Sequence, residues 1–384
     1  AAETGHSRID VRRINLIKPS QIPYAMVCGG TIDSGEMTEL FDMALATADV
    51  AGFAKRKAES AENGKLRGIG FGMYLEQCGN GADEGVDIEF QDDGRVILHG
   101  SQQCNGQGHQ TTVTQILSDR LGYDADLITV KQGDSNRSPR GTTGGARMTA
   151  VLGSATAVAA AKIIDLAKPF AAEALECGED DLNFTDGLFL RQDTNRSIAI
   201  EDLVRQLAIS GEKHRLNWAQ PYETDGATYP YGCHIIELEI DRQTCAVEIA
   251  SYHVVDDFGL VINPLTLEGQ IHGGIAQGVG QALLEHVVYD DSGQLLAGSL
   301  MDYALPRADH FPGFQISTRN TACANNALGI KGSGEAGAIG APQAVISAIC
   351  DALDITHIDM PATPLAIFNA MKAKAANSPR HKGE

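Results

Sequence analysis

A single carboxylate lies within a loop of closely spaced glycines near the end of the chain. Glu335 is flanked by Gly332, Gly334 and Gly337, and an apolar run with helical spacing follows from Ala344 to Leu353. Glycine lets a backbone approach a ligand closely, and the unpaired N–H groups at the start of a helix attract anions. Such a carboxylate has two interpretations: a general base acting on a bound molecule, or a partner for the helix dipole only.

Glycine and glutamine recur together in other loops that precede helical patterns. They occur together in the segments Gly106 to His109, Gly269-Gln270 and Ala276 to Gly278, and a further glycine loop without glutamine runs from Gly141 to Arg147. A glutamine side chain both donates and accepts hydrogen bonds, so it can recognise the edge of a heterocycle or an oxo group. No loop carries the Lys-Ser/Thr ending of a P-loop. The glycines from Gly68 to Gly72 match half of a dinucleotide-binding fingerprint but lack its βαβ context.

The elements that must position these loops follow an order that occurs twice. A hairpin, a Gly/Gln loop, a helix, a strand, a glycine loop and an Ala-rich helix are expected at 86–99, 106–110, 111–121, 127–130, 141–147 and 150–167. The same order returns with a hairpin at 234–253, a helix opened by Gly269, strands near 286–289 and 314–318, and a helix at 342–353. We therefore predict an α+β fold of two similar subdomains, residues 66–232 and 233–384, after a mainly helical linker at 1–65. A ligand site between the subdomains is expected.

The amino-acid composition excludes several kinds of molecule as binding partners. The net charge of the 384 residues is −20, which disfavours nucleic acid and anionic membranes. Eight cysteines occur without CxxC spacing, which indicates free thiols in a reducing cytoplasm and no zinc or iron–sulfur signature. No signal peptide or long apolar run is recognised. Because the sequence opens without Met inside a polar helical pattern, we expect a processed subunit or part of a longer polypeptide.

Taken in order, the motifs resemble the C-terminal half of a molybdopterin-binding large subunit. The family is that of xanthine dehydrogenase, aldehyde oxidase and carbon monoxide dehydrogenase, and the resemblance extends over nearly the whole chain. Arg12 to Ile17, Asp257 to Pro264 and Met301 to Pro306 add to it. The segment from Lys331 to Gly337 resembles the most diagnostic motif of the family, in which the glutamate is the catalytic base.

The resemblance implies a molybdenum hydroxylase subunit that oxidises an aldehyde or N-heterocycle, with Glu335 as the base. The implied cofactor is molybdopterin with molybdenum, either alone or as a dinucleotide, and no side chain is expected to bind the metal. The implied cofactor contacts are Gly106, Gln107, Gly108, His109, Thr143, Gly144, Gly145, Ala146, Arg147, Gln270, Lys331, Gly332 and Gly334. Iron–sulfur clusters and FAD are expected on partner chains. The family's first-half loops do not occur here, so a first-half polypeptide is an expected partner as well.

Two alternatives stay open. The chain is a non-catalytic cofactor-binding or assembly subunit that needs a partner chain, or it is a hydrolase in which Glu335 works with His109 or His272. Metal analysis separates these possibilities, because bound molybdenum would point to the molybdenum hydroxylase. The substrate, the form of the pterin and the oligomeric state are not determined by the sequence.

Overall fold

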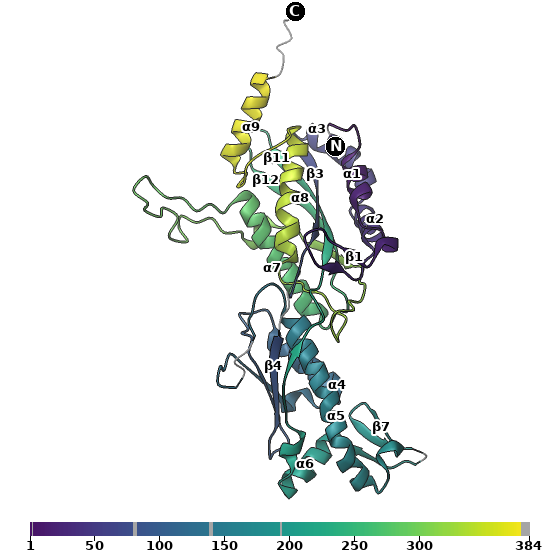
Figure 1. Ribbon diagram of the computed structural model, residues 1–384. Helices are drawn as coiled ribbons and strands as arrows, with labels where there is room; N and C mark the ends of the chain where they lie inside the picture. The colour runs from purple at the N-terminus through teal and green to yellow at the C-terminus, as the bar shows by residue number, and fades with distance from the viewer. Residues whose placement is uncertain (2, 80–82, 138–140, 193, 378–384) are drawn as a thin grey trace, which may run out of the picture.

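The computed structural model describes residues 1, 3–79, 83–137, 141–192 and 194–377. The described chain is an elongated α+β molecule of two lobes, and each lobe contains a four-stranded sheet (Figure 1). Both ends of the described chain lie at the upper lobe.

The lower lobe is built on a sheet of order β10-β4-β5-β6. Strands β4 (Asp83–Phe90) and β5 (Val96–Gly100) form the predicted antiparallel hairpin. Helix α4 (His109–Leu121) then leads to β6 (Ile128–Gln132), which is parallel to β5, and β10 (Trp218–Glu223) closes the other edge. Helix α5 (Ser154–Leu175) follows a π-helical turn at Thr149–Gly153. The lobe ends in β7 (Leu182–Thr185), β8 (Leu188–Arg191), β9 (Ser197–Ala199) and α6 (Ile200–Ser210).

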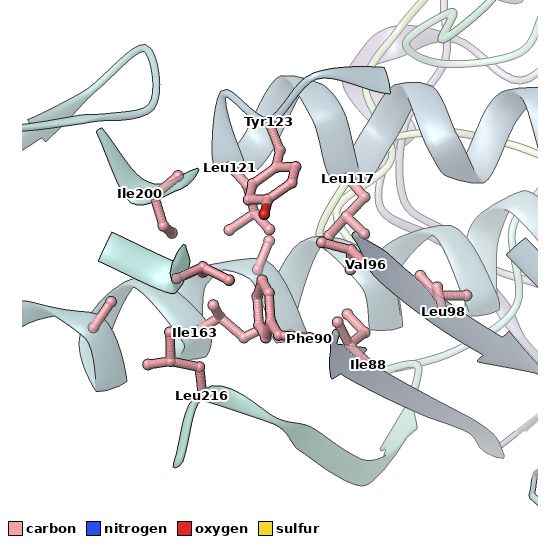
Figure 2. Close-up of a cluster of buried hydrophobic side chains, with 14 of the residues drawn as sticks. Ile88, Phe90, Val96, Leu98, Leu117, Leu121, Tyr123, Ile163, Ile200 and Leu216 are labelled. Carbon is pink, nitrogen blue, oxygen red and sulfur yellow. The ribbon is translucent and has the colours of Figure 1, made fainter. Parts of the chain in front are cut away.

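A continuous apolar core holds these elements together. Ile88 and Phe90 of the sheet meet Leu117 and Leu121 of α4 and Ile163 of α5 within one buried cluster (Figure 2). The alternating pattern of β4 places its apolar residues on the face that α4 and α5 cover. The hairpin and the two helices therefore form one unit, and the loops at the starts of both helices have a rigid base.

The upper lobe is built on a sheet of order β13-β12-β11-β3. Strands β11 (Tyr231–Asp241) and β12 (Val247–Asp257) form a second predicted hairpin. Helix α7 (Pro264–Leu283) precedes β13 (Phe314–Thr318), which is parallel to β12, and β3 (Lys65–Leu75) lies antiparallel to β11. The remaining elements are α1 (Arg8–Asn15), β1 (Tyr24–Ala25), β2 (Thr31–Ile32), α2 (Met37–Thr47), α3 (Phe53–Glu62), α8 (Ala336–Leu353) and α9 (Pro364–Asn377).

The two sheets share one arrangement. Each has a central hairpin, a third strand that joins in parallel after one helix, and an antiparallel strand at the opposite edge. The edge strands differ in their place along the chain, because β10 follows its hairpin whereas β3 precedes the entire lower lobe. The predicted boundaries at 66 and 233 stay a prediction about domains, but hydrogen bonding assigns β3 to the sheet of the second hairpin.

Three glycines on one face of β3 allow α8 to lie directly against the strand. A Cβ atom at Gly68, Gly70 or Gly72 would come within 2.1, 1.9 or 2.2 Å of a backbone oxygen of α8. Residues at alternate positions of a strand share a face, so the spacing of these glycines follows from the packing of the helix. This contact, and not a dinucleotide fingerprint, accounts for the motif.

Several predicted boundaries change. The helix predicted from Gly269 already begins at Pro264, and the one predicted from Pro342 begins at Ala336, with Pro342 inside it. No strand forms at 286–289, where an isolated bridge joins Tyr289 to Leu295. By length and composition, the helical stretches Thr149–Leu175 and Ala336–Leu353 would suit a membrane span. Most of their alanines are instead buried in the cores of the two lobes.

Candidate functional site

A cavity of about 270 Å³ lies where the two lobes meet, and four loops line it. Each loop directly precedes a helix: α4, the π turn of α5, α7 or α8. The N–H groups at a helix start are free to bind an anion or an oxo group. Among the predicted contacts, the cavity lining includes Gln107, His109, Thr143, Gly144, Gly145, Ala146, Arg147, Gln270, Lys331, Gly332 and Gly334, together with Glu335.

Gly106 and Gly108 do not line the cavity and instead shape the loop before α4. Both have positive φ, at 116° and 77°, which favours glycine. Their turn brings Gln107 and His109 to the cavity wall, where the Oε1 atom of Gln107 accepts the N–H of Asn105. The side chain of His109 is buried, and burial lowers its pKa to about 4. At neutral pH the imidazole is therefore uncharged.

The loop before α5 has the most unusual backbone at the site. Gly145 and the following Ala146 have φ values of 56° and 48°, a left-handed conformation that is costly for alanine. Thr143 fixes the loop, because its hydroxyl accepts the N–H of Gln103 at 2.8 Å and donates to the Gln103 oxygen at 2.9 Å. A Cβ at Gly144 or Gly145 would meet no atom within 4 Å. These glycines therefore leave open space beside the cavity wall.

The loop before α7 joins the lobes. Asn263 begins the helix by accepting the N–H of Thr266 at 3.1 Å, and it also donates to Gln115 of α4. Gln115 in turn donates to the Ile262 oxygen at 2.8 Å. Gln270 lies on the second turn of α7 and faces the cavity. His272, two residues later, is not among the residues that line the cavity, so the structure does not place it with Glu335.

Lys331 lines the cavity, but its charge is directed elsewhere. Its side chain is fully buried, and Nζ donates to Asp257 at 2.9 Å and to Thr321 at 3.1 Å. The backbone of Lys331 also donates to the Phe258 oxygen at 2.7 Å. This lysine therefore ties the loop before α8 to the loop after β12.

Gly332 and Gly334 differ in how much space is available for a side chain at each position. A Cβ on Gly332 would lie 2.6 Å from the Ala146 oxygen and 2.7 Å from Sγ of Cys78, so only glycine fits there. A Cβ on Gly334 would make ordinary contacts of 3.7 Å or more. The close packing at Gly332 brings the loops before α5 and α8 together.

Glu335 is the last residue before α8, and its side chain makes no capping hydrogen bond to that helix. Glu335 is exposed to solvent at the cavity wall. The carboxylate is thus available to a bound molecule, as the interpretation as a general base requires, while its place at the start of α8 also suits the interpretation as a partner for the helix dipole.

The carboxyl group of Glu76 lies within hydrogen-bonding reach of Glu335. Burial, reinforced by this contact, raises the pKa of Glu76 to about 7. Sequence reasoning missed Glu76, because a glutamate at the end of a strand has no local signal that links it to a loop some 260 positions later in the chain.

The residues present fit an anionic, oxo-bearing organic ligand. The loops before four helix starts line one cavity, and the space beside Gly144 and Gly145 leaves room for a group to approach the backbone. Within the described residues, no group of three or more His, Cys, Asp or Glu side chains is placed to hold a metal ion. A metal held here by an organic ligand is compatible with this set of donors.

Comparisons with known proteins identify the family of this chain and several of its relatives. Residues 43–312 match the model of a family described as the molybdopterin cofactor-binding domain. The carbon monoxide dehydrogenase large chain of Hydrogenophaga pseudoflava is 31% identical over 97% of this chain and 49% of its own length. The nicotine 6-hydroxylase large subunit of Paenarthrobacter nicotinovorans is 30% identical over 95% of this chain and 47% of its own.

A solved structure, that of quinoline 2-oxidoreductase from Pseudomonas putida 86, superposes with a TM-score of 0.90 at 29% identity. That superposition covers 97% of this chain and 50% of the other. The chain therefore spans about half the length of the relatives it matches, and its α+β architecture is shared with them.

Proposed function

Because this chain belongs to the molybdopterin cofactor-binding domain family, we propose that it forms one wall of the cofactor site of a molybdenum hydroxylase and supplies its catalytic base. The observation that carries the proposal is the carboxylate of Glu335, which lines the shared cavity without capping α8. The rest of the cofactor site and of the enzyme would come from the polypeptide that supplies the remaining half of the relatives' length.

Each loop has a part in this proposal. Backbone N–H groups of Gly144, Gly145 and Ala146 would hold the pterin and its phosphate, while Gln107 and Gln270 would bind polar edges of the cofactor. When bound, the molybdenum cofactor supplies the transferred oxygen and accepts two electrons from the substrate. Glu335 would act as the general base that takes up a proton at the cavity wall. His109 is uncharged and does not compete for that proton.

We infer that the substrate is an aldehyde or an N-heterocycle, with the heterocycle favoured. Two of the similar proteins bear the names of N-heterocyclic substrates, nicotine and quinoline. Such a substrate has an electron-poor ring carbon, which suits attack by an oxygen that a neighbouring carboxylate deprotonates.

The electrons from such an oxidation must pass to other centres, which we assign to iron–sulfur and flavin partner chains in a cytoplasmic complex. An arm between α7 and β13 supports the need for a partner. It extends from the upper lobe (the green arm in Figure 1) and exposes Tyr289, Leu300 and Met301 at 60%, 80% and 93%. Exposed apolar side chains gathered on one segment are typical of a surface that another polypeptide covers.

The decisive experiment replaces the base in the assembled enzyme. Glu335→Gln is expected to keep the melting temperature and the molybdenum content, and to lower turnover by about 10²–10⁴-fold, the usual contribution of a general base. Glu268→Gln serves as the control, because this exposed glutamate of α7 is not among the residues that line the cavity. Turnover of Glu335→Gln within twofold of the parent would refute the assignment and favour a non-catalytic, cofactor-binding subunit.

A further inference from the structure

Two carboxyl groups from distant parts of the chain meet beside the cavity, which Glu335 lines and Glu76 does not. Glu76 directly follows β3, Glu335 directly precedes α8, and their side chains are within hydrogen-bonding reach. The Oε2 atom of Glu76 is buried, and no described residue directs an N–H or O–H donor at it. Two carboxylates have no proton to share, so the contact forms a hydrogen bond only when one of them is protonated.

The backbone around Glu76 is fixed by the same loops that form the cavity. Cys78 exchanges two backbone hydrogen bonds of 2.9 Å with Thr228, and the Thr228 hydroxyl accepts the N–H of Gly332 at 3.2 Å. Gly79 donates to the Gly145 oxygen at 3.1 Å. The segment from Glu76 to Gly79 is therefore held against both glycine loops, and the position of the Glu76 carboxyl is set by the site itself.

We propose that Glu76 is a positioning residue for Glu335: its protonated carboxyl donates a hydrogen bond to the Glu335 carboxylate and holds that carboxylate in place at the cavity wall. This inference rests on the proposed function, in which Glu335 is the base. It adds a second acidic residue with a different role, because Glu76 keeps its proton while Glu335 takes one up.

The surroundings of Glu76 determine which carboxyl carries the proton. Burial and the contact with Glu335 together raise the pKa of Glu76 to about 7, although a hydrogen bond with the Cys78 thiol acts in the opposite direction. The other titratable groups that face it are the Cys78 thiol and the Tyr74 phenol, whose pKa values are both raised, chiefly by burial. Neither carries a charge at neutral pH. Glu76 is therefore protonated below about pH 7, and at higher pH it loses its donor and repels Glu335.

A measurement without turnover tests the protonation. The infrared absorption of protonated carboxyl groups, followed against pH in the 384-residue chain, should contain a component that titrates near pH 7. Asp256 is also buried with a pKa raised to about 8, so the spectrum of Glu76→Gln is subtracted to isolate Glu76. In Glu335→Gln the same component should move to lower pH, because the neighbouring negative charge is gone. The proposal is overturned if subtraction of the Glu76→Gln spectrum removes no titrating component.

The pH profile of the assembled enzyme tests the positioning role. Glu76→Gln keeps an N–H donor at every pH, so it should retain turnover and lose the decline in kcat/KM above about pH 7. Glu76→Ala has no donor, and misplacement of the base should lower kcat about 10–10²-fold with a smaller change in KM. The melting temperatures of both variants show whether the fold survives, and the infrared result stands if Glu76→Ala does not fold.

The outcomes separate this inference from the proposed function. Full turnover in Glu335→Gln would show that Glu335 is not the base, and it would therefore overturn the proposed function. An inactive Glu335→Gln together with parent-like rates and pH profiles in both Glu76 variants would leave the base in place and overturn only the role of Glu76.

Discussion

The charged ammonium group of Lys331 forms a buried ion pair with Asp257 and does not point toward the cofactor site. The lysine was predicted to bind the cofactor because it opens the glycine loop that contains Glu335. In the structure its Nζ is bound to Asp257, Thr321 and the oxygen of Ser34, and it lies 5.0 Å from the ring centre of Tyr231. A motif therefore identified the right loop while the direction of one side chain depended on residues far away in sequence.

The ion pair yields the first prediction. Lys331→Met leaves Asp257 buried without its cation, and loss of one member of a buried pair typically costs about 3–5 kcal/mol. The free energy of unfolding measured in urea should fall by that amount. In the double variant Lys331→Met/Asp257→Asn the loss should be clearly smaller than in the single variant, because no charge is left unpaired. An unchanged free energy of unfolding in Lys331→Met would show that the ammonium group faces the cavity instead.

At the scale of single residues, the sequence indicated which residues reach the cavity better than it indicated which residues act together. Glu335 and Gln107 reach the predicted cavity because each belongs to a loop that precedes a helix, a feature visible in local spacing, whereas Gln270 reaches it from the second turn of α7. The partnership of Glu335 with Glu76 is not visible in this way. It depends on β3 and α8 lying side by side, and only the folded chain brings these two elements together.

The contact between β3 and α8 is the element-scale feature on which the site depends. Glu76 lies at the end of β3 and Glu335 at the beginning of α8, so the spacing of these two elements sets the distance between the carboxyl groups. Glycines at alternate positions of the strand permit the close approach, as the contacts of Gly68, Gly70 and Gly72 with α8 show.

Gly70→Ala tests this packing. The added methyl would lie 1.9 Å from the Ala344 oxygen, so helix and strand must separate, at a cost typical of overpacking, about 1–3 kcal/mol. The control is Gly85→Ala in β4, where a Cβ would meet no atom within 4 Å and stability should stay the same or rise slightly. Thermal unfolding of both variants gives the comparison. Equal melting temperatures would mean that α8 does not rest on β3 as described.

Helices and hairpins were largely predictable, whereas their limits were not. Both hairpins and α4, α5 and α7 follow from periodic patterns of apolar residues. Pro342 suggested a helix start, but packing against the upper sheet maintains α8 across it, from Ala336 onward. The apolar residues near 287 suggested a strand, and instead they are exposed on the arm, where no neighbouring strand pairs with them.

At the scale of the whole molecule, the chain crosses between lobes more than its repeated pattern suggests. After β3 it leaves the upper lobe, completes the lower lobe, and returns at β11 to pair with β3. Sequence periodicity could not reveal this pairing, because a strand pattern does not specify a distant partner. The crossing places segment 76–79 at the junction, next to the loops of both lobes, and so a strand of one lobe contributes to a site that both lobes form.

The arm between α7 and β13 gives the last prediction, which concerns assembly. The arm has internal order, because Leu296 donates to the Val288 oxygen at 2.8 Å and Tyr303 donates to Glu285 at 2.7 Å. Apolar side chains of the arm nevertheless remain exposed, so their burial by the polypeptide that supplies the other half of the subunit would stabilise the complex. Leu300→Asp with Met301→Asp should weaken that association by about 10–10²-fold, as loss of central apolar contacts does.

The same double substitution should leave the melting temperature of the isolated chain unchanged, because both side chains are at least 80% exposed in it. Ile209→Asp is the matched control, since this residue is 90% exposed on α6 at the far end of the lower lobe. Association is measured by titrating each variant with the other half of the subunit, and molybdenum content by metal analysis of the complex. If the arm variant associated as tightly as the Ile209 variant, the arm would not be the surface through which the site is completed, and the glycine loops themselves would have to provide the interface.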